Sequence, residues 1–205
     1  IIKKEITMDI DKLGEIIQKE NIKVMNLPAP LFNSYGMEKP EIFKGIECLQ
    51  TGGDVISPKA VSMVLKEWNG ISIVNGYGPT ENTVTSTAFI INNSWDDKQE
   101  VPIGKPVSNS TAYIMDKNNK LLPIGVVGEL CVGGDGVARG YLNREELNRE
   151  RFILNPYVKG ERIYKTGDFA KMLPDGNIKF LGRMDNQVKI RGYRIELGEI
   201  EKENT

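Results

Sequence analysis

Apolar and polar residues alternate along the first 91 residues in a way that predicts helices and short strands in turn. Apolar positions recur at helical spacing from Asp11 to Asn21, with Asp9 or Asp11 as the N-cap. A second helix is expected to begin at Ser57-Pro58, because Ser caps helices well and Pro fits the first turn. Short apolar runs predict strands at 22–27, 45–50, 71–75 and 82–91. Helices between such strands indicate an α/β layer with a mostly parallel sheet.

The pattern changes in the second half of the chain to short strands separated by turns. Pro174-Asp175-Gly176 lies between two alternating runs and is a strong hairpin signal. One helix is expected at 144–152, with Asn143 as its cap. We therefore predict a small antiparallel sheet or distorted barrel after the α/β layer. The expected subdomains are a partial α/β subdomain, a β-rich barrel-like subdomain, and a hinge with the start of a C-terminal subdomain, at 1–93, 94–181 and 182–205.

Net charge and hydropathy exclude two classes of partner. The chain has 27 basic and 28 acidic residues and a net charge of -1, whereas nucleic-acid binding usually needs a basic excess. No apolar run approaches the ~18 residues that a membrane helix needs. We expect a cytoplasmic protein with no nucleic-acid or membrane partner. The chain also lacks an initiator Met and a signal peptide, and we expect it to be an interior piece of a longer protein.

The absence of histidine limits the available chemistry. It excludes mechanisms that need an imidazole base and disfavours a zinc site. Cys48 and Cys131 each lie in an apolar stretch, which predicts two buried thiols in a reducing compartment rather than a disulfide. Chemistry must then come from carboxylates, Lys, Arg, hydroxyls, backbone amides or a bound metal.

The sequence NGYGPTE, residues 75–81, follows a predicted buried strand. Ligands of open parallel sheets bind beyond the carboxyl ends of strands, and glycines let a backbone approach them closely. Tyr77 could stack on a base, Thr80 could donate to a phosphate, and Glu81 could hold a hard cation such as Mg²⁺. On the local pattern alone, a Gly-Pro turn with an exposed Glu is the favoured interpretation.

Two glycine-rich stretches are weaker signals. LQTGGD, residues 49–54, would suit the flat face of a ligand, but the same letters form common loops. GELCVGGDGVARGYL, residues 128–142, is not a phosphate-binding loop, because it lacks the Gly-Lys-Ser/Thr ending. We interpret this second stretch as strand packing and tight turns.

A fourth cluster joins YKTGD, residues 164–168, to the charged stretch 182–194. Asp168 could accept hydrogen bonds from a ribose diol. Arg183 and Arg194 have forked donors that suit phosphate or carboxylate groups. The alternative is a solvated surface of ion pairs, which is what most charged runs form.

Taken in chain order, four of these stretches resemble the core motifs of adenylate-forming enzymes. More narrowly, they resemble the amino-acid adenylation domains of non-ribosomal peptide synthetases: NGYGPTE, GELCVGGDGVARGYL, YKTGD and GRMDNQVKIRGYRIELGEIE. The resemblance implies an AMP-forming ligase that converts an amino acid and ATP to an aminoacyl adenylate and loads the phosphopantetheine of a carrier protein. D-alanine–carrier-protein ligases and other acyl or aryl adenylate-forming ligases remain alternatives. A non-catalytic, adenylation-like scaffold is an alternative of another class.

The resemblance also implies a role for each matched position. Tyr77 would stack on the adenine, Asp168 would bind the ribose hydroxyls, and Glu81 would hold Mg²⁺. The implied positions for binding ATP or AMP are Gly52, Gly53, Asn75, Gly76, Tyr77, Thr80, Asp168 and Arg183. The implied amino-acid pocket consists of Asn26, Leu49, Thr51, Gly76, Val84 and Thr85.

Catalytic positions are implied as well. Thr80 would contact the α-phosphate and Glu81 would act through the metal. Asp185 would be the hinge to a mobile C-terminal domain, and Gly192 and Arg194 would belong to a loop that enters the site for thioester formation.

Three parts of the family's site have no counterpart in these 205 residues. They are the phosphate loop with its lysine, the aspartate that pairs with the substrate ammonium, and the late lysine that polarises the carboxylate. We therefore expect the 205 residues by themselves to catalyse little or nothing, with weak AMP binding at most.

Overall fold

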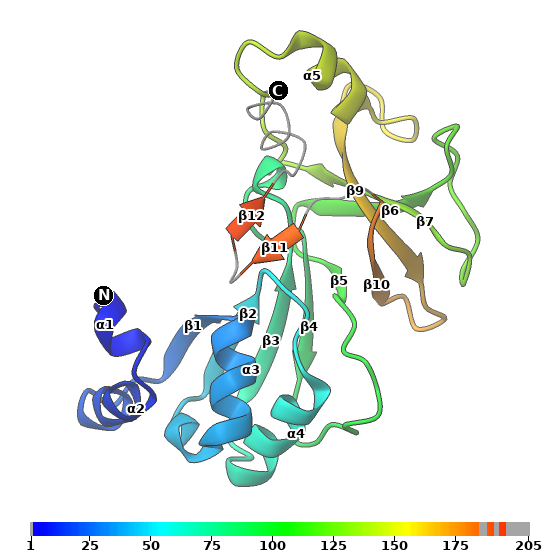
Figure 1. Ribbon diagram of the computed structural model, residues 1–205. Helices are drawn as coiled ribbons and strands as arrows, with labels where there is room; N and C mark the ends of the chain where they lie inside the picture. Colours follow the sequence, from blue (N-terminus) through cyan, green and yellow to red (C-terminus); the bar gives the residue numbers. More distant parts are fainter. Residues whose placement is uncertain (1, 185–187, 191–192, 196–205) are drawn as a thin grey trace. The chain divides into compact units, whose positions relative to one another are not determined.

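The computed structural model describes residues 2–184, 188–190 and 193–195 (Figure 1). Contacts divide the chain into two compact units. The α/β unit consists of Ile1–Asn75 and Ile90–Val101, and the barrel unit consists of Gly76–Phe89 and Pro102–Thr205. The subdomain bounds expected from composition stay a prediction.

The α/β unit follows the helix and strand signals of the sequence. Its elements are α1 (Lys4–Thr7), α2 (Ile10–Lys19), β1 (Val24–Pro28), α3 (Ala29–Glu38), the 3₁₀ helix η1 (Pro40–Phe43), β2 (Cys48–Gly52), α4 (Pro58–Glu67) and the start of β3 (Ser72–Tyr77). The Asp9 side chain accepts from the Lys12 amide at 3.1 Å, and Ser57 Oγ accepts from the Ala60 amide at 3.3 Å. Both predicted N-caps are thereby confirmed. The sequence did not predict α3.

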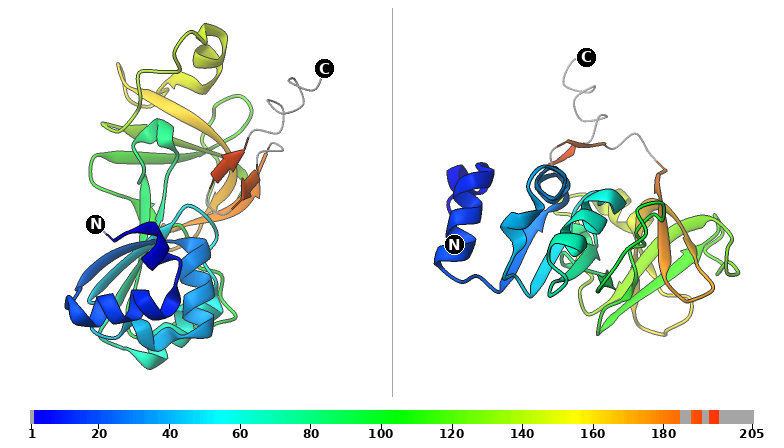
Figure 2. Two further views of the ribbon diagram at one scale, coloured as in Figure 1. Left: turned by 60° about the vertical axis from the view of Figure 1, so that its left-hand side comes forward. Right: turned by 90° about the horizontal axis from the view of Figure 1, so that it is seen from below.

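The first sheet has the strand order β1-β2-β3-β4-β5, with β4 at Thr87–Ile91 and β5 at Lys105–Pro106. β1 and β2 run in parallel. Helices α3 and α4 lie side by side over one face of these strands (Figures 1 and 2). Burial of apolar side chains between the helices and the strands is the main favourable contribution to folding of this layer. Its fully buried side chains include Leu27, Phe32, Phe43, Leu49, Val61, Val64 and Ile73.

The barrel unit is built on a curled antiparallel sheet. Its strand order is β10-β9-β7-β6, and β8 pairs with β9. The bounds are η2 (Thr80–Asn82), β6 (Ser110–Met115), β7 (Gly128–Gly134), α5 (Glu145–Arg151), β8 (Phe152–Leu154), β9 (Arg162–Met172) and β10 (Ile178–Arg183). A separate two-stranded sheet pairs β11 (Val188–Ile190) with β12 (Tyr193–Ile195). The predicted fold class, an α/β layer followed by a small antiparallel sheet or distorted barrel, is confirmed.

The barrel unit has two buried hydrophobic clusters, and the alternation of Cys131 with Leu130 and Val132 along β7 places them on opposite faces of the sheet. The larger cluster consists of Ile103, Ile114, Leu130, Val132, Phe152, Tyr164, Ala170 and Ile178, and the smaller one of Met115, Cys131 and Ile163. The predicted Pro-Asp-Gly hairpin joins β9 to β10, and the Asp175 side chain accepts from the Asn177 amide at 2.9 Å. One local prediction is wrong: Asn143 does not cap α5, because the N-cap position is Arg144 and its side chain makes no capping bond.

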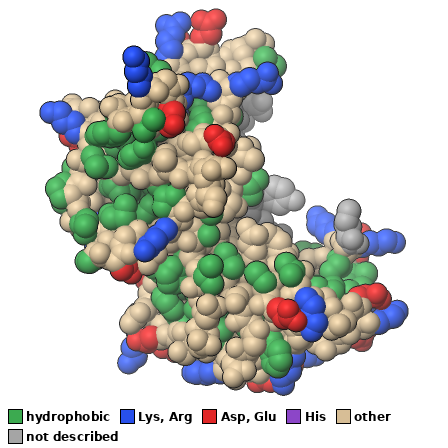
Figure 3. Space-filling model, turned by 180° about the vertical axis from the view of Figure 1, so that it is seen from behind, with side chains coloured by type: hydrophobic (Ala, Val, Ile, Leu, Met, Phe, Trp, Pro, Cys, Tyr) green, Lys and Arg blue, Asp and Glu red, His purple; other side chains and the backbone are tan. Residues whose placement is uncertain are grey.

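Of the two thiols predicted to be buried, Cys131 is buried and Cys48 is only partly buried. Cys48 and Cys131 are both free, and burial together with the negative charge of Glu129 raises the pKa of the Cys131 thiol to about 12. Figure 3 shows apolar side chains among polar ones on one face, which is common on folded domains. Within the described ranges, every helix is too short or too polar to cross a bilayer.

Candidate functional site

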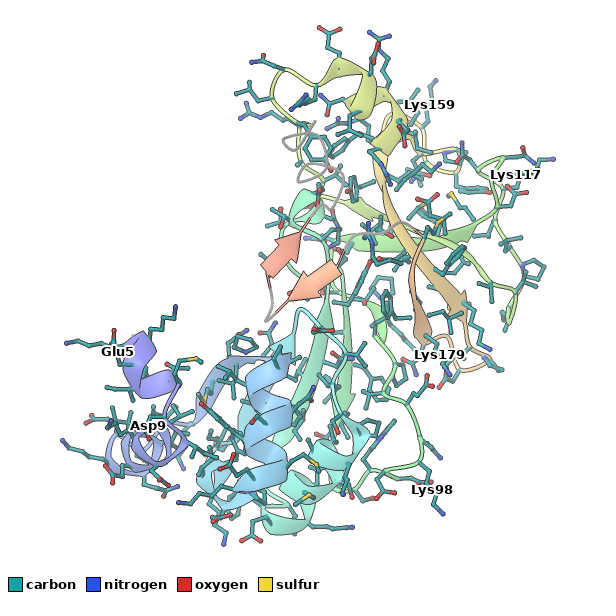
Figure 4. All side chains as sticks on the ribbon, in the orientation of Figure 1. Glu5, Asp9, Lys98, Lys117, Lys159 and Lys179 are labelled. Carbon is teal, nitrogen blue, oxygen red and sulfur yellow. The ribbon has the colours of Figure 1, made fainter. Side chains whose placement is uncertain are left out.

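Two carboxylates stand apart from all other charged groups in the described part of the chain. Glu81 and Asp168 are each 6% exposed and are the only charged side chains there that are buried. Most other charges point into solvent, as Lys98, Lys117 and Lys159 do in Figure 4. Burying a charge is costly unless partners compensate for it. Both residues were candidates from the sequence, and the partners of each define a cluster in the barrel unit.

The motif around Tyr77 begins inside a strand. β3 runs through Tyr77, two residues further than the sequence predicted. The Ser86 amide donates to the Tyr77 carbonyl at 2.8 Å, which closes the following loop. A Cβ at Gly78 would lie 2.4 Å from the Val84 carbonyl oxygen. The glycine is therefore required because another backbone segment occupies the space of a side chain.

That loop also holds strained backbone. Thr83 and Val84 have φ values of 50° and 67°, which are unusual for β-branched residues. Thr83 Oγ1 donates to the Gly136 carbonyl at 2.7 Å and helps to hold this conformation. Strain of this kind clusters at functional sites. It also explains why β4 begins at Thr87 and not at residue 82, as the β-branched composition predicted.

The first cluster surrounds Asp168. Arg183 Nη1 donates to Asp168 Oδ1 at 2.9 Å, and the Tyr77 hydroxyl donates to Asp168 Oδ2. Arg183 Nη1 also donates to the Thr166 carbonyl at 2.9 Å, which fixes the guanidinium. Burial raises the pKa of the Tyr77 hydroxyl well above its usual value, and the charge of Asp168 adds to this effect. The hydroxyl therefore stays protonated and remains a donor to the carboxylate.

A bulge in β9 places Asp168. Glu129 pairs with Phe169 and Cys131 pairs with Lys165, so the three residues 166–168 face one residue of β7. Thr166 Oγ1 donates to the Leu130 carbonyl at 2.6 Å and accepts from the Asp168 amide at 3.0 Å. Gly167 has a φ of +71°, which a side chain would disfavour. The letters TGD in YKTGD thus specify a bulge, and bulges commonly re-aim a side chain beside a site.

The second cluster surrounds Glu81. Its Oε1 accepts from the Tyr141 hydroxyl at 2.5 Å, and that hydroxyl lies 3.0 Å from the Tyr164 hydroxyl. The Glu81 carbonyl accepts from the Ala138 amide at 2.9 Å. Burial raises the pKa of Tyr141, and its hydrogen bond to Glu81 adds to the shift. Both tyrosines belong to segments that also line the barrel core, so Glu81 is held in one place.

Residues of the predicted amino-acid pocket are only partly brought together. Leu49 and Thr51 are buried and lie two residues apart on β2, hence on one face. The register pairs Asn26 with Gln50, so Asn26 is on the opposite face and is exposed. Thr51 Oγ1 is buried without a hydrogen-bond partner among the described residues. In the barrel unit, Val84 is 73% exposed.

The predicted nucleotide positions lie at or near strand ends. Gly52 is the last residue of β2, and Gly53 follows it with a φ of +82° and open space beside its Cα. Asn75 is buried within β3, and Gly76 follows it in the same strand. Thr80 begins η2 and is exposed.

Three predicted residues cannot be placed in the site. Asp185 and Gly192 lie outside the described residues. Arg194 lies in β12, where the backbone alone is described. Their predicted roles stay predictions.

Sequence reasoning missed the residues that support the two carboxylates. Tyr141, Tyr164 and Thr166 lie within the quoted motifs, yet nothing local distinguished them from packing residues. Tyr141 contacts Glu81 across 60 positions of sequence. The available signal was weak: a polar ring or hydroxyl at a position where the alternating pattern predicts burial.

Comparison with known proteins identifies the family. The family model for the AMP-binding enzyme matches residues 1–142. The chain belongs to the AMP-binding enzyme family. Among solved structures, holo-PA1221, described as a non-ribosomal peptide synthetase protein with adenylation and PCP domains, has a TM-score of 0.87 and 32% identity. The match covers 96% of this chain and 34% of that one.

Curated relatives of this AMP-binding chain are peptide synthetases. It is 52% identical over 201 residues to tyrocidine synthase 3 of Brevibacillus parabrevis, covering 98% of this chain and 3% of the relative. It is 52% identical over 200 residues to surfactin synthase subunit 2 of Bacillus subtilis, and this match covers 98% of this chain and 6% of the relative. The chain thus spans a small part of the relatives that it matches. The family and the peptide-synthetase branch predicted from the motifs are confirmed.

Gly78 allows a stability test of the Tyr77 loop. We expect Gly78→Ala to lower the free energy of unfolding by about 1–3 kcal/mol, because the new methyl group overlaps backbone atoms that cannot yield cheaply. Urea denaturation measures this change. Gly160→Ala is a comparison for backbone strain alone, because its Cβ meets nothing within 4 Å but its φ of +85° disfavours any side chain. A loss below about 0.5 kcal/mol in Gly78→Ala would contradict the steric argument.

Proposed function

We propose that this protein is part of an amino-acid-activating ligase of non-ribosomal peptide synthesis. A carboxylate oxygen of the amino acid attacks the α-phosphorus of ATP, the bond to the bridging oxygen breaks, and pyrophosphate leaves. The thiol of a carrier protein's phosphopantetheine then loses its proton and attacks the acyl carbon, and AMP leaves. The relatives named above support this proposal, as does the fused adenylation and PCP domain arrangement of the solved neighbour.

The cluster of Tyr77, Asp168 and Arg183 is the observation that carries the proposal. A buried carboxylate with an aromatic hydroxyl on one oxygen and a guanidinium on the other is held in one orientation. Asp168 can then accept hydrogen bonds from the two ribose hydroxyls. Tyr77 offers a ring for the adenine, and its tilted contact with Phe180, at 6.3 Å between centroids, keeps that ring in place.

Glu81 suits a role in holding Mg²⁺. Mg²⁺ at a nucleotide site is usually held by one or two carboxylates together with phosphate oxygens and waters. Glu81 is buried and anchored through Tyr141, so its carboxylate is fixed before any ligand arrives. The ion would supply positive charge beside the phosphate oxygens. Thr80, exposed at the start of η2, would donate to the α-phosphate.

The amino-acid pocket draws on Leu49, Thr51 and Gly76 in this proposal. The buried Thr51 hydroxyl supports a pocket, because such a group costs free energy unless a ligand or water satisfies it. Val84 and Thr85 would contribute from the strained loop. Asn26 lies on the opposite face from Leu49 and Thr51, so its role in the pocket rests on the motif resemblance alone.

Amino-acid-dependent exchange of pyrophosphate into ATP tests the function. The full-length protein is assayed with the common α-amino acids, D-alanine, aryl acids and fatty acids. We expect one α-amino acid, or a few similar ones, to stimulate exchange strongly over the acid-free control. Stimulation by D-alanine or by aryl or fatty acids alone would favour the other ligases. No stimulation by any acid, with ATP binding absent as well, would favour the non-catalytic scaffold.

A further inference from the structure

We propose that Glu129 is a positioning residue for nucleotide recognition, because its carboxylate holds the bulge that carries Asp168. This inference rests on the proposed role of Asp168 in binding ribose. Glu129 lies on β7 within the stretch GELCVGG. From the sequence alone, we interpreted this stretch as strand packing and tight turns. Its contacts indicate a second use.

Glu129 makes two polar contacts with β9. Its Oε1 accepts from the Gly167 amide at 3.1 Å, and its Oε2 lies 3.3 Å from Lys165 Nζ. The Glu129 side chain is 11% exposed, so solvent does little to satisfy it. One carboxylate thus bridges a backbone amide and a cation on the same bulged segment.

The Gly167 amide needs this partner because the bulge removes it from the ladder. Three residues, 166–168, face Leu130 alone, so the extra amides cannot all find partners on β7. Thr166 Oγ1 satisfies the Asp168 amide, and Glu129 satisfies the Gly167 amide. On the other side of β9, the Met184 amide donates to the Gly167 carbonyl at 2.8 Å. Gly167 is held from both sides, immediately before Asp168.

Removal of the Glu129 carboxylate should therefore act on the direction of the Asp168 side chain. The Gly167 amide would be left buried without an acceptor, and the segment would shift to find one. Hydrogen bonds weaken steeply with misalignment, so the contacts of Asp168 with ribose hydroxyls would suffer first. The phosphate contacts come from another segment, and the Tyr77 ring is also held by Phe180, so these contacts would be affected less.

Binding of ATP and of 2′,3′-dideoxy-ATP, measured by calorimetry on the full-length protein without amino acid, tests the proposal. In the unmodified protein we expect ATP to bind more tightly, because the dideoxy compound lacks the hydroxyls. In Glu129→Ala we expect ATP affinity to fall about tenfold while dideoxy-ATP affinity changes less than about twofold. Glu129→Asp, which keeps the charge but is one methylene shorter, should show the same selective loss and tests the proposal even if the alanine variant does not fold.

Three further variants complete the design. Glu129→Gln keeps an acceptor for Gly167 and should restore the preference for ATP. Lys165→Gln removes only the ion pair and should keep that preference. Glu145→Ala, at an exposed Glu paired with Arg149, is the matched control and should change neither affinity.

The outcomes separate this inference from the proposed function. Equal weakening of both nucleotides in the Ala and Asp variants would show a general structural role and overturn the inference alone. If Glu129→Gln does not prefer ATP over dideoxy-ATP, the hydrogen bond from the Gly167 amide to Glu129 is not what positions Asp168, and the inference is overturned. An unmodified protein that binds both nucleotides equally would overturn the ribose role of Asp168, and the inference with it.

Discussion

The Glu81→Gln variant should lose about 10²–10³-fold in kcat for pyrophosphate exchange, which is the usual effect of removing one preorganised electrostatic contact. The substitution keeps an oxygen that can accept from the Tyr141 hydroxyl, so the local packing is retained. It removes the negative charge that holds a divalent cation. Because that charge matters most as phosphate charge develops, the loss should appear in kcat more than in the KM for ATP.

Titration with Mg²⁺ separates this effect from a folding defect. The Glu81→Gln variant should need a higher Mg²⁺ concentration for half-maximal exchange, whereas its thermal unfolding midpoint should change little. Glu145→Gln is the matched control, because that side chain is 85% exposed and forms an ion pair with Arg149 on the same helix. A kcat within twofold of the unmodified protein, at the same Mg²⁺ requirement, would remove Glu81 from the proposed site.

The Asp168→Asn variant should bind ATP about 10²-fold more weakly. A hydrogen bond to a charged group contributes about 1.5–3 kcal/mol, and 1.4 kcal/mol corresponds to a factor of ten. The Asn side chain keeps an acceptor for Arg183, yet its neutral amide is a poorer partner for two ribose hydroxyls. The guanidinium of Arg183, whose side chain is 18% exposed, also loses its anion, so we expect some loss of stability.

Calorimetry with ATP measures the affinity, and Asp97→Asn, at an exposed position, is the control. The two substitutions should have different effects. Asp168→Asn should raise the Kd for ATP without changing the Mg²⁺ requirement. Glu81→Gln should raise the Mg²⁺ requirement and change the affinity for ATP little. An Asp168→Asn variant with unchanged ATP affinity would contradict the ribose assignment.

Capping and turn rules predicted elements correctly where the deciding residues are neighbours in the sequence. Helix α4 begins at Pro58 after the Ser57 cap, and the Pro-Asp-Gly turn joins β9 to β10, both as expected. Helix α3 was missed because its sequence, APLFNSYGME, contains Pro and Gly and shows little helical periodicity. Its packing against α4 and the sheet outweighs this weak propensity.

Errors occurred where a distant contact outweighed composition. The β-branched run from Thr83 predicted extended backbone, yet Thr83 and Val84 have positive φ. The contact of Thr83 with the Gly136 carbonyl is made across 53 positions. Rules based on neighbouring residues cannot predict such a contact, because the tertiary structure determines which distant residue lies within reach.

The sequence by itself determined the family, the succession of an α/β layer and an antiparallel β region, and local features such as the Ser57 cap and the Pro-Asp-Gly turn. Motif letters carry that information because each specifies a local turn, cap or strand. Only the tertiary structure decided that Glu81 and Asp168 are the buried carboxylates and that Tyr141 and Glu129 support them. Tyr141 and Glu81 are 60 positions apart in the sequence, and Glu129 and Gly167 are 38 positions apart. Burial forces each polar group to find a partner, and which partner lies within reach depends on how the strands pair.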